Sequence, residues 1–324
     1  MTSREHINEY FNGQPFMILC ALTLILATAV ALSMGVNPPA EDSSGIFFSL
    51  KGSLLGNGPL SATINVVCLL VTGGIMLALN KVFGYVREVT RLFVSAFFLL
   101  QIANPSGLVA FNNGTLLCLV SALATMPLFA SFQDHHSQRS IFLIFALVAA
   151  GCMFHYGFLV LIPAFLLGFL NMGVFNLKGV LAMLFGLITP FWIVLGLGIA
   201  SPADAVAPQW MFLERVPMTP LIVLASATAI LGIVLAAMNF HTIMNYRVQP
   251  RVYNAFFIIV LVLAVIALFL GHRELMVFLP LLNLMVAVQV AQFHTLRTFH
   301  YRYVFIILFI ACCVGFCAIN LMSS

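Results

Sequence analysis

Hydrophobic residues in this chain form long, nearly unbroken runs that are separated by short polar segments. Most runs approach the length of about 20 residues that an α-helix needs to cross the hydrocarbon core of a bilayer. The pattern predicts an all-α polytopic membrane protein with about eleven transmembrane helices in a single domain, residues 1–324. The eleven runs are 15–35, 61–82, 89–108, 113–132, 140–154, 156–174, 178–200, 218–240, 253–271, 274–293 and 302–322.

Two of these runs are shorter than a comfortable span. Residues 140–154 and 156–174 are separated only by His155. We expect these two helices to be tilted, or to re-enter the membrane against protein rather than lipid.

The amino-acid composition excludes several classes of protein. Hydrophobic residues make up 63% of the 324 residues and charged residues only 7%. Soluble domains are about 45–50% apolar and about 25% charged, so a water-soluble domain is excluded. Nucleic-acid binding and disorder are excluded as well, because they need a charged surface or a polar chain.

Charge predicts the orientation. With the N-terminus inside, ten basic residues fall in inner loops and three in outer loops, which is a strong positive-inside asymmetry. We therefore expect the N-terminus inside and the C-terminus outside. The inner set is Arg4, Lys81, Arg87, Arg91, Arg139, Lys178, Arg247, Arg251, Arg297 and Arg302, and the outer set is Lys51, Arg215 and Arg273.

Two outer loops, residues 36–60 and 201–217, are longer than the others. Each combines an apolar face with one or two charges, which favours a short helix lying in the membrane interface. We expect such helices over residues 45–55 and 204–215, with Trp210 as an interfacial anchor.

Candidate chemistry is concentrated at the outer face. No Asp, Glu, Lys or Arg lies near the middle of a predicted helix, which argues against proton-driven transport. Ionisable groups held near the membrane often mark a site, although they also simply fill short loops, where Arg273 can pair with Glu274. The outer polar residues are Glu41, Asp42, Lys51, Asn104, Asn112, Asn113, His155, Asp204, Glu214, Arg215, His272, Arg273 and Glu274.

Part of the chain resembles a known group of proteins. A helix ending at Asn104-Pro105, a neutral turn with Asn112-Asn113 and the segment Gly186-Leu187-Ile188-Thr189-Pro190-Phe191 occur in an order that resembles an uncharacterised family of multi-pass inner-membrane proteins from Bacteroidota. The likeness covers residues 92–192. It implies a bacterial inner (cytoplasmic) membrane location and no particular activity.

The same stretch is loosely similar to the membrane domain of C-type glycosyltransferases, which use a polyprenyl-phosphate-linked sugar at the outer face. That resemblance implies a catalytic carboxylate in the first outer loop, where Glu41 and Asp42 stand. It also implies outer cationic groups that hold the donor phosphate. The candidates for phosphate binding are His155, Arg215, His272 and Arg273.

Three functions fit these features: an enzyme of the C type, a transporter of a lipid-like substrate, and a non-catalytic assembly subunit whose small-residue helix face lies between Gly179 and Gly198. Membrane lipid is an expected partner in each case, and a polyprenyl-phosphate-linked substrate in the first. No nucleic acid is expected as a partner, and the sequence does not identify the protein partners that an assembly subunit would have. The sequence predicts no cofactor and no metal site, since His135-His136 beside Asp134 lack helical ligand spacing.

Overall fold

The structure is a computed structural model, and it describes residues 10–37, 45–48, 58–86, 90–134, 137–174, 176–206, 219–270, 274–296 and 302–323. These residues form helices and connecting turns, with no strand among them. The prediction of an all-α protein is confirmed.

Eight helices in the described residues are long and apolar enough to cross a membrane. Three shorter apolar helical segments accompany them. The chain is therefore built as a multi-pass membrane protein. The eight are α2 (Gln14–Ser33), α3 (Pro59–Phe83), α5 (Asn113–Ala130), α8 (Leu177–Gly196), α9 (Pro220–Ile243), α10 (Val248–Leu270), α11 (Leu275–Leu296) and α12 (Arg302–Ser323). The shorter ones are α4 (Leu92–Ile102), α6 (Gln138–Phe154) and α7 (Leu161–Asn171), the last preceded by the 3-10 turn η2 (Tyr156–Val160).

Local sequence explains where several helices begin and end. Pro59 and Pro220 open α3 and α9, where a missing backbone N–H costs nothing. Asn112 caps α5 by accepting a hydrogen bond from the Thr115 N–H at 2.8 Å. The predicted span 89–108 is interrupted, because α4 ends at Ile102 and the turn η1 (Pro105–Gly107) follows.

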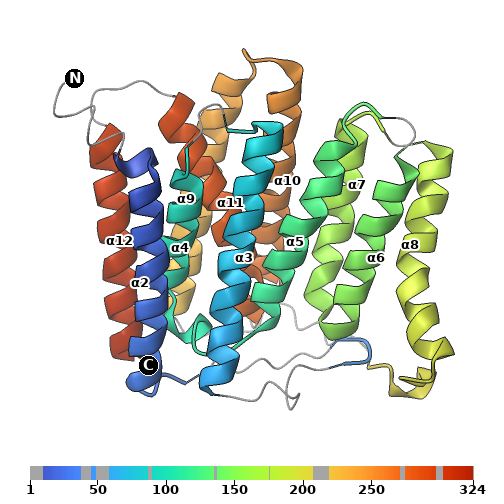
Figure 1. Cartoon of the computed structure of the whole chain (residues 1–324), viewed down its shortest axis with the longest axis horizontal. Helices are drawn as coiled ribbons and strands as arrows, with labels where there is room; N and C mark the ends of the chain where they lie inside the picture. Colours follow the sequence, from blue (N-terminus) through green and yellow to red (C-terminus); the bar gives the residue numbers. More distant parts are fainter. Residues whose placement is uncertain are drawn as a thin grey trace.

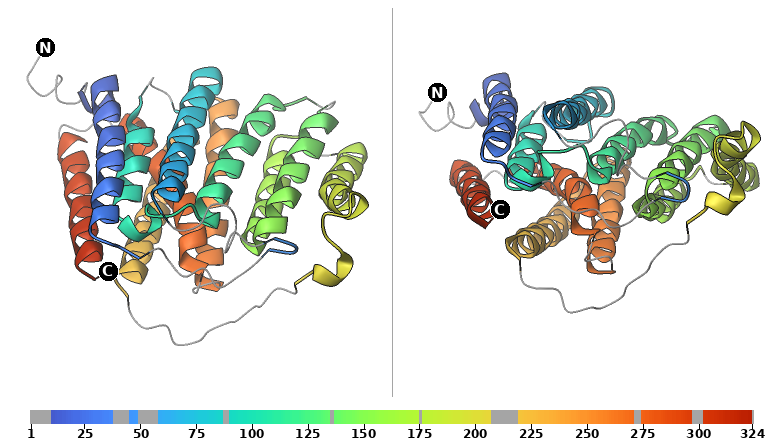
Figure 2. Two further views of the ribbon diagram at one scale, coloured as in Figure 1. Left: turned by 60° about the horizontal axis from the view of Figure 1, so that its bottom comes forward. Right: turned by 90° about the horizontal axis from the view of Figure 1, so that it is seen from below.

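Helix α11 lies at the centre of the bundle. It packs against α4, α5, α9 and α10. In its most apolar stretch of 18 residues, 94% of the residues are buried. Figures 1 and 2 show the helices standing side by side, with α6, α7 and α8 extending to the side of the molecule away from α2 and α12. A buried amide group supports this packing. Asn239 of α9 donates to the Gln289 side chain at 3.0 Å, and Gln289 donates to Asn254 of α10 at 3.1 Å.

Helix α8 is far less buried than α11. Only 11% of the residues in its most apolar stretch of 18 residues are buried. The helix forms one edge of the molecule and packs on α6 (Figure 1). A Cβ added at Gly186 would lie 2.6 Å from the Phe142 carbonyl oxygen, so glycine permits this close approach. Gly179 and Gly186 are buried within this protein and do not lie on an exposed face of α8.

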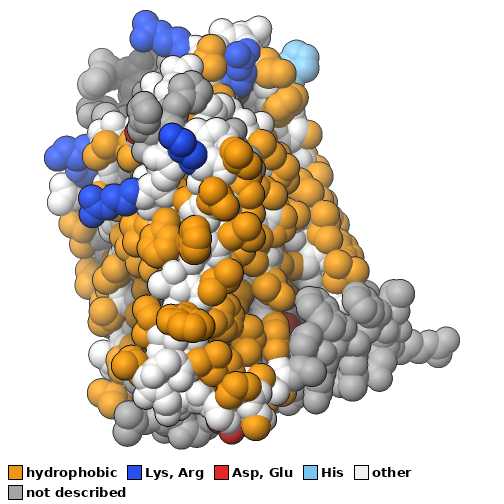
Figure 3. All heavy atoms as spheres, turned by 90° about the vertical axis from the view of Figure 1, so that its right-hand side faces the viewer, with side chains coloured by type: hydrophobic (Ala, Val, Ile, Leu, Met, Phe, Trp, Pro, Cys, Tyr) orange, Lys and Arg blue, Asp and Glu red, His pale blue; other side chains and the backbone are white. Residues whose placement is uncertain are grey.

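The two ends of the bundle differ in charge. We call the end at which α2, α4, α6, α8, α10 and α12 begin the basic end, and the other the acidic end. Figure 3 shows Lys and Arg side chains at the basic end and a broad hydrophobic belt below them. All six Lys and Arg residues whose side chains are described lie at the basic end: Lys81, Arg91, Arg139, Lys178, Arg247 and Arg251.

The expected interfacial helices are not present in the described parts of the two long loops. Residues 45–48 are a bent, non-helical segment, so the prediction of a helix over 45–55 is wrong there. In the second loop, Pro202–Asp204 form one 3-10 turn and residues 205–206 are not helical. The remainder of both predicted helices, including Trp210, lies outside the described residues.

Candidate functional site

The acidic end contains a break in the helical path at His155. Helix α6 ends at Phe154, and His155 adopts an extended conformation before η2 begins. Its Nδ1 accepts a hydrogen bond from the Gly157 N–H at 2.8 Å, which caps η2. The side chain is completely buried. The short helices on each side of His155 therefore meet at a fixed corner, not at a flexible loop.

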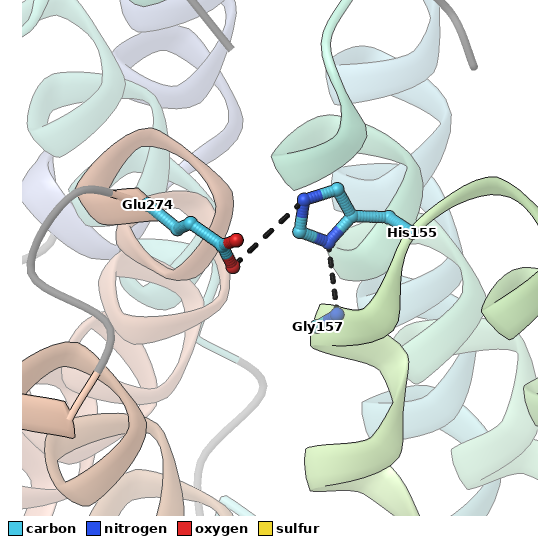
Figure 4. Close-up of polar contacts among 3 residues, drawn as sticks. All are labelled: His155, Gly157 and Glu274. Carbon is cyan, nitrogen blue, oxygen red and sulfur yellow. Dashed lines mark hydrogen bonds and ion pairs between the residues drawn. The ribbon is translucent and has the colours of Figure 1, made fainter. Parts of the chain in front are cut away.

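Glu274 faces this corner from the start of α11. Its Oε2 lies 3.9 Å from Nε2 of His155, and its side chain remains 27% exposed (Figure 4). This distance is longer than a hydrogen bond and within the range of an ion pair. The two residues lie 119 positions apart in the sequence, at 155 and 274, and the packing of α11 brings them together.

The hydrogen bond from Gly157 determines which nitrogen of the neutral His155 ring carries the proton. Because Nδ1 accepts a hydrogen bond from a backbone N–H, the neutral ring of His155 carries its own proton on Nε2, which faces Glu274. Burial lowers the pKa of His155, and the negative charge of Glu274 opposes that change. The dominant effect of burial favours the neutral ring.

Close backbone contacts fix the geometry around the pair. A Cβ added at Gly114 of α5 would lie 2.3 Å from the Met276 carbonyl oxygen, two residues after Glu274. A Cβ added at Gly157 would lie 2.9 Å from both Nδ1 of His155 and a methyl carbon of Val277. Glycine is required at both positions for α11 to approach α5 and η2 this closely.

Several asparagine side chains near the acidic end have structural partners. Asn65 donates to the Gly107 carbonyl at 2.9 Å and accepts from the Thr115 hydroxyl at 2.6 Å. Asn112 donates to the same carbonyl at 3.1 Å. Asn104 contacts the Met276 sulfur at 3.2 Å. These amides connect α3, η1, α5 and α11, and thereby support the position of Glu274.

The two long loops meet beside His155. Backbone N–H groups of residues 46–48 donate to the Cys152 and Met153 carbonyls at the end of α6, at 2.9–3.3 Å. The Val206 N–H donates to the Ile46 carbonyl at 3.1 Å, and the Tyr156 hydroxyl donates to the Val206 carbonyl. We call this contact of residues 45–48 and Val206 with residues 152–156 the loop junction.

Of the six site residues predicted from the sequence, the structure places His155 at the loop junction. Glu41, Asp42, Arg215, His272 and Arg273 lie outside the described residues. Asp42 stands three residues before Gly45, and Arg273 directly precedes Glu274.

Sequence reasoning did not select Glu274 or Gly157 as site residues. His155 stands between two apolar runs, which indicates that its imidazole is buried. A buried imidazole needs polar partners for both nitrogens, and Gly157 and Glu274 are those partners.

The other described acid at this end, Asp204, is exposed and closes its own turn. The Ser201 N–H and hydroxyl donate to its carboxylate at 2.8 and 2.9 Å. These hydrogen bonds hold the pKa of Asp204 below its usual value. Asp204 is thus a loop carboxylate with a local structural task, unlike Glu274.

Among the described residues, no three His, Cys, Asp or Glu side chains come together as metal ligands. Comparisons of the chain with protein families, with curated proteins and with solved structures find no match. The function therefore has to be argued from the site. This end of the molecule therefore provides a buried imidazole, a partly exposed carboxylate that faces its Nε2, and backbone hydrogen bonds that join residues 45–48 and Val206 to the end of α6 and to Tyr156.

Proposed function

We propose that this protein is an integral membrane enzyme, similar to C-type glycosyltransferases, that acts on a polyprenyl-phosphate-linked sugar at its acidic end. The observation that supports the proposal is the loop junction. Residues 45–48 and Val206, which are the described parts of the two long loops in this contact, lie beside the His155 corner that Glu274 faces. Ionisable groups held close to the membrane often mark a substrate site.

Each predicted residue has a role in this proposal. An outer carboxylate, assigned from the sequence to Glu41 or Asp42, removes the proton of the acceptor hydroxyl. Arg215, His272 and Arg273 hold the phosphate of the donor lipid. His155 is buried, so it acts on a ligand through its neighbour Glu274 and not by direct contact.

The membrane placement is part of the same proposal. The basic end faces the cytoplasm and the acidic end faces outward, in the inner membrane of a bacterium. In this arrangement the three shorter segments α4, α6 and η2–α7 also pass through the bilayer, giving about eleven crossings. The concentration of the described Lys and Arg residues at one end supports this orientation.

Lipid binding provides a first test. The full chain is placed in phosphatidylcholine nanodiscs, and its thermal unfolding is followed with added undecaprenyl phosphate. Undecaprenol and phosphatidic acid serve as controls, which separate the contributions of the polyprenyl chain and of the phosphate. At a hundredfold excess over the Kd, we expect undecaprenyl phosphate to stabilise the protein by about 2.7 kcal/mol.

Variants and turnover complete the test. Arg273→Gln and Arg215→Gln should weaken the stabilisation by undecaprenyl phosphate, while Arg247→Gln at the basic end should not. Release of radioactive hexose from undecaprenyl-phosphate hexose, to water or to a glycan acceptor, then measures transfer. Equal responses to all three lipids together with no hexose release would refute the enzyme proposal. An assembly subunit would then be favoured, or a lipid transporter if vesicle assays show lipid movement.

A further inference from the structure

Both ring nitrogens of His155 face groups of the protein itself. Nδ1 accepts from the Gly157 N–H, and Nε2 carries a proton that faces Glu274. The neutral ring therefore presents no lone pair to a ligand, and the side chain is fully buried. His155 does not have the geometry of a general base, since a base must offer an unprotonated atom to the hydroxyl that it deprotonates.

Glu274 has the geometry that His155 lacks. Its Oε2 faces His155, its side chain is partly exposed, and its backbone is fixed at the start of the central helix. We propose that Glu274 is the carboxylate that accepts the proton of the acceptor hydroxyl, with His155 as its positioning residue. This inference rests on the proposed function and replaces Glu41 or Asp42 as the assigned base.

The acceptor oxygen forms a bond to C1 of the sugar, while the bond between C1 and the phosphate oxygen breaks. The electron pair of the broken bond leaves with the polyprenyl phosphate. The proton of the acceptor hydroxyl moves to Oε1 of Glu274 and is later released to water at the acidic end.

His155 supplies orientation in this step. A donor directed at Oε2 restricts rotation of the carboxylate and leaves Oε1 for the proton of the acceptor. The separation of 3.9 Å has to shorten for a direct hydrogen bond, and catalytic hydrogen bonds commonly tighten only when the substrate is bound. Glu274 directly precedes α11, which packs against four other helices, and this position fixes the carboxylate more firmly than a loop would.

Two substitutions at one position separate positioning from structure. In His155→Asn the side-chain oxygen takes the place of Nδ1 and still accepts from Gly157, but no donor reaches Glu274. In His155→Gln the amide nitrogen takes the place of Nε2 and retains that donor. If His155 positions Glu274, the Gln variant restores kcat and the Asn variant does not. A role only in capping η2 would give the reverse order.

The decisive experiment measures hexose transfer from undecaprenyl-phosphate hexose by the full chain in nanodiscs. Glu274→Gln is expected to lower kcat by about 10²–10⁴-fold with little change in KM for the donor. It keeps an oxygen for the Nε2 proton, so the fold should be retained, as thermal unfolding will check. Glu41→Gln and Asp42→Asn are measured in parallel and should retain more activity than Glu274→Gln.

Carbodiimide labelling with an added amine, read by mass spectrometry, gives a second readout that needs no turnover. Undecaprenyl-phosphate hexose should protect Glu274 from labelling, while the exposed carboxylate of Asp204 serves as an internal control and stays reactive. The inference is overturned if wild-type protein transfers hexose and Glu274→Gln transfers it equally well, or if the donor leaves Glu274 labelling unchanged. Absence of transfer and of donor binding by wild-type protein would instead refute the proposed function, and this inference with it.

Discussion

The contact between α5 and α11 at Gly114 provides a direct test of how the site is held together. Substitution by alanine adds a Cβ that would lie 2.3 Å from the Met276 carbonyl oxygen and 2.9 Å from that of Val277. Ordinary contacts begin at 3.4 Å, so the two backbones must separate by about 1.1 Å. Both obstacles are backbone atoms, which no rotamer change can move. Overpacking of this kind costs about 1–3 kcal/mol.

The assay is unfolding of the full chain in mixed micelles, with Gly74→Ala as the matched control. Gly74 lies within α3 and nothing is within 4 Å of an added Cβ, so alanine there should be neutral or stabilising by up to about 1 kcal/mol. We expect Gly114→Ala to be destabilised relative to both the wild-type protein and the control. It should also weaken undecaprenyl phosphate binding, because Arg273, one of the residues proposed to hold the phosphate, stands two positions before the start of α11. Equal stability of the two variants would refute the close approach of α5 and α11.

Three further predictions follow from the helices and the site. Because burial lowers the pKa of His155 below the unfolded value of about 6.5, folding stability should fall as the pH drops below 6.5, and His155→Gln should lose that part of the pH dependence in thermal unfolding. Gln289→Leu leaves the buried Asn239 amide without one acceptor and should destabilise the protein by about 1–2 kcal/mol in the same assay, whereas a neutral effect would contradict the hydrogen bond. A reporter that is active only outside the cytoplasm should work when fused after Ser324 and be silent within residues 242–250; activity of both fusions would contradict the proposed orientation.

Helix positions were the part of the fold that the sequence predicted well. Runs of about 20 apolar residues can satisfy their backbone groups in lipid only as helices, so a local pattern was enough. The predicted run 89–108 ended early because the residue before Pro105 is driven out of the helical conformation. That signal was local as well, and Asn104-Pro105 was visible as a turn.

The first loop could not be predicted in the same way. Residues 45–55 have the composition of an interfacial helix, yet the backbone of residues 46–48 donates to the carbonyls that end α6. Gly45 makes this possible, because a Cβ there would lie 2.2 Å from the Met153 carbonyl oxygen. The hydrogen bonds join segments about 100 residues apart, and no local pattern in either segment reports them.

The central position of α11 did have a signal in the sequence. Its apolar run contains Asn283, Gln289 and Gln292, which would be costly against lipid. A span with several amides has to be surrounded by protein, and the structure buries all three. Recognising this would have placed the start of α11, and therefore Glu274, among other helices.

The central position of α11 also bears on which carboxylate does chemistry. A catalytic group has to be held within a fraction of an ångström, and residues at the ends of packed helices meet this requirement better than residues in loops. Glu274 directly precedes a helix that four others surround, and it faces an imidazole whose ring is itself held by Gly157. Glu41 and Asp42 precede residues 45–48 in the sequence, and it is these later residues whose backbone contacts the end of α6. Measuring these three carboxylates side by side therefore tests whether the chemistry at this membrane surface is determined by the helix core or by the outer loop.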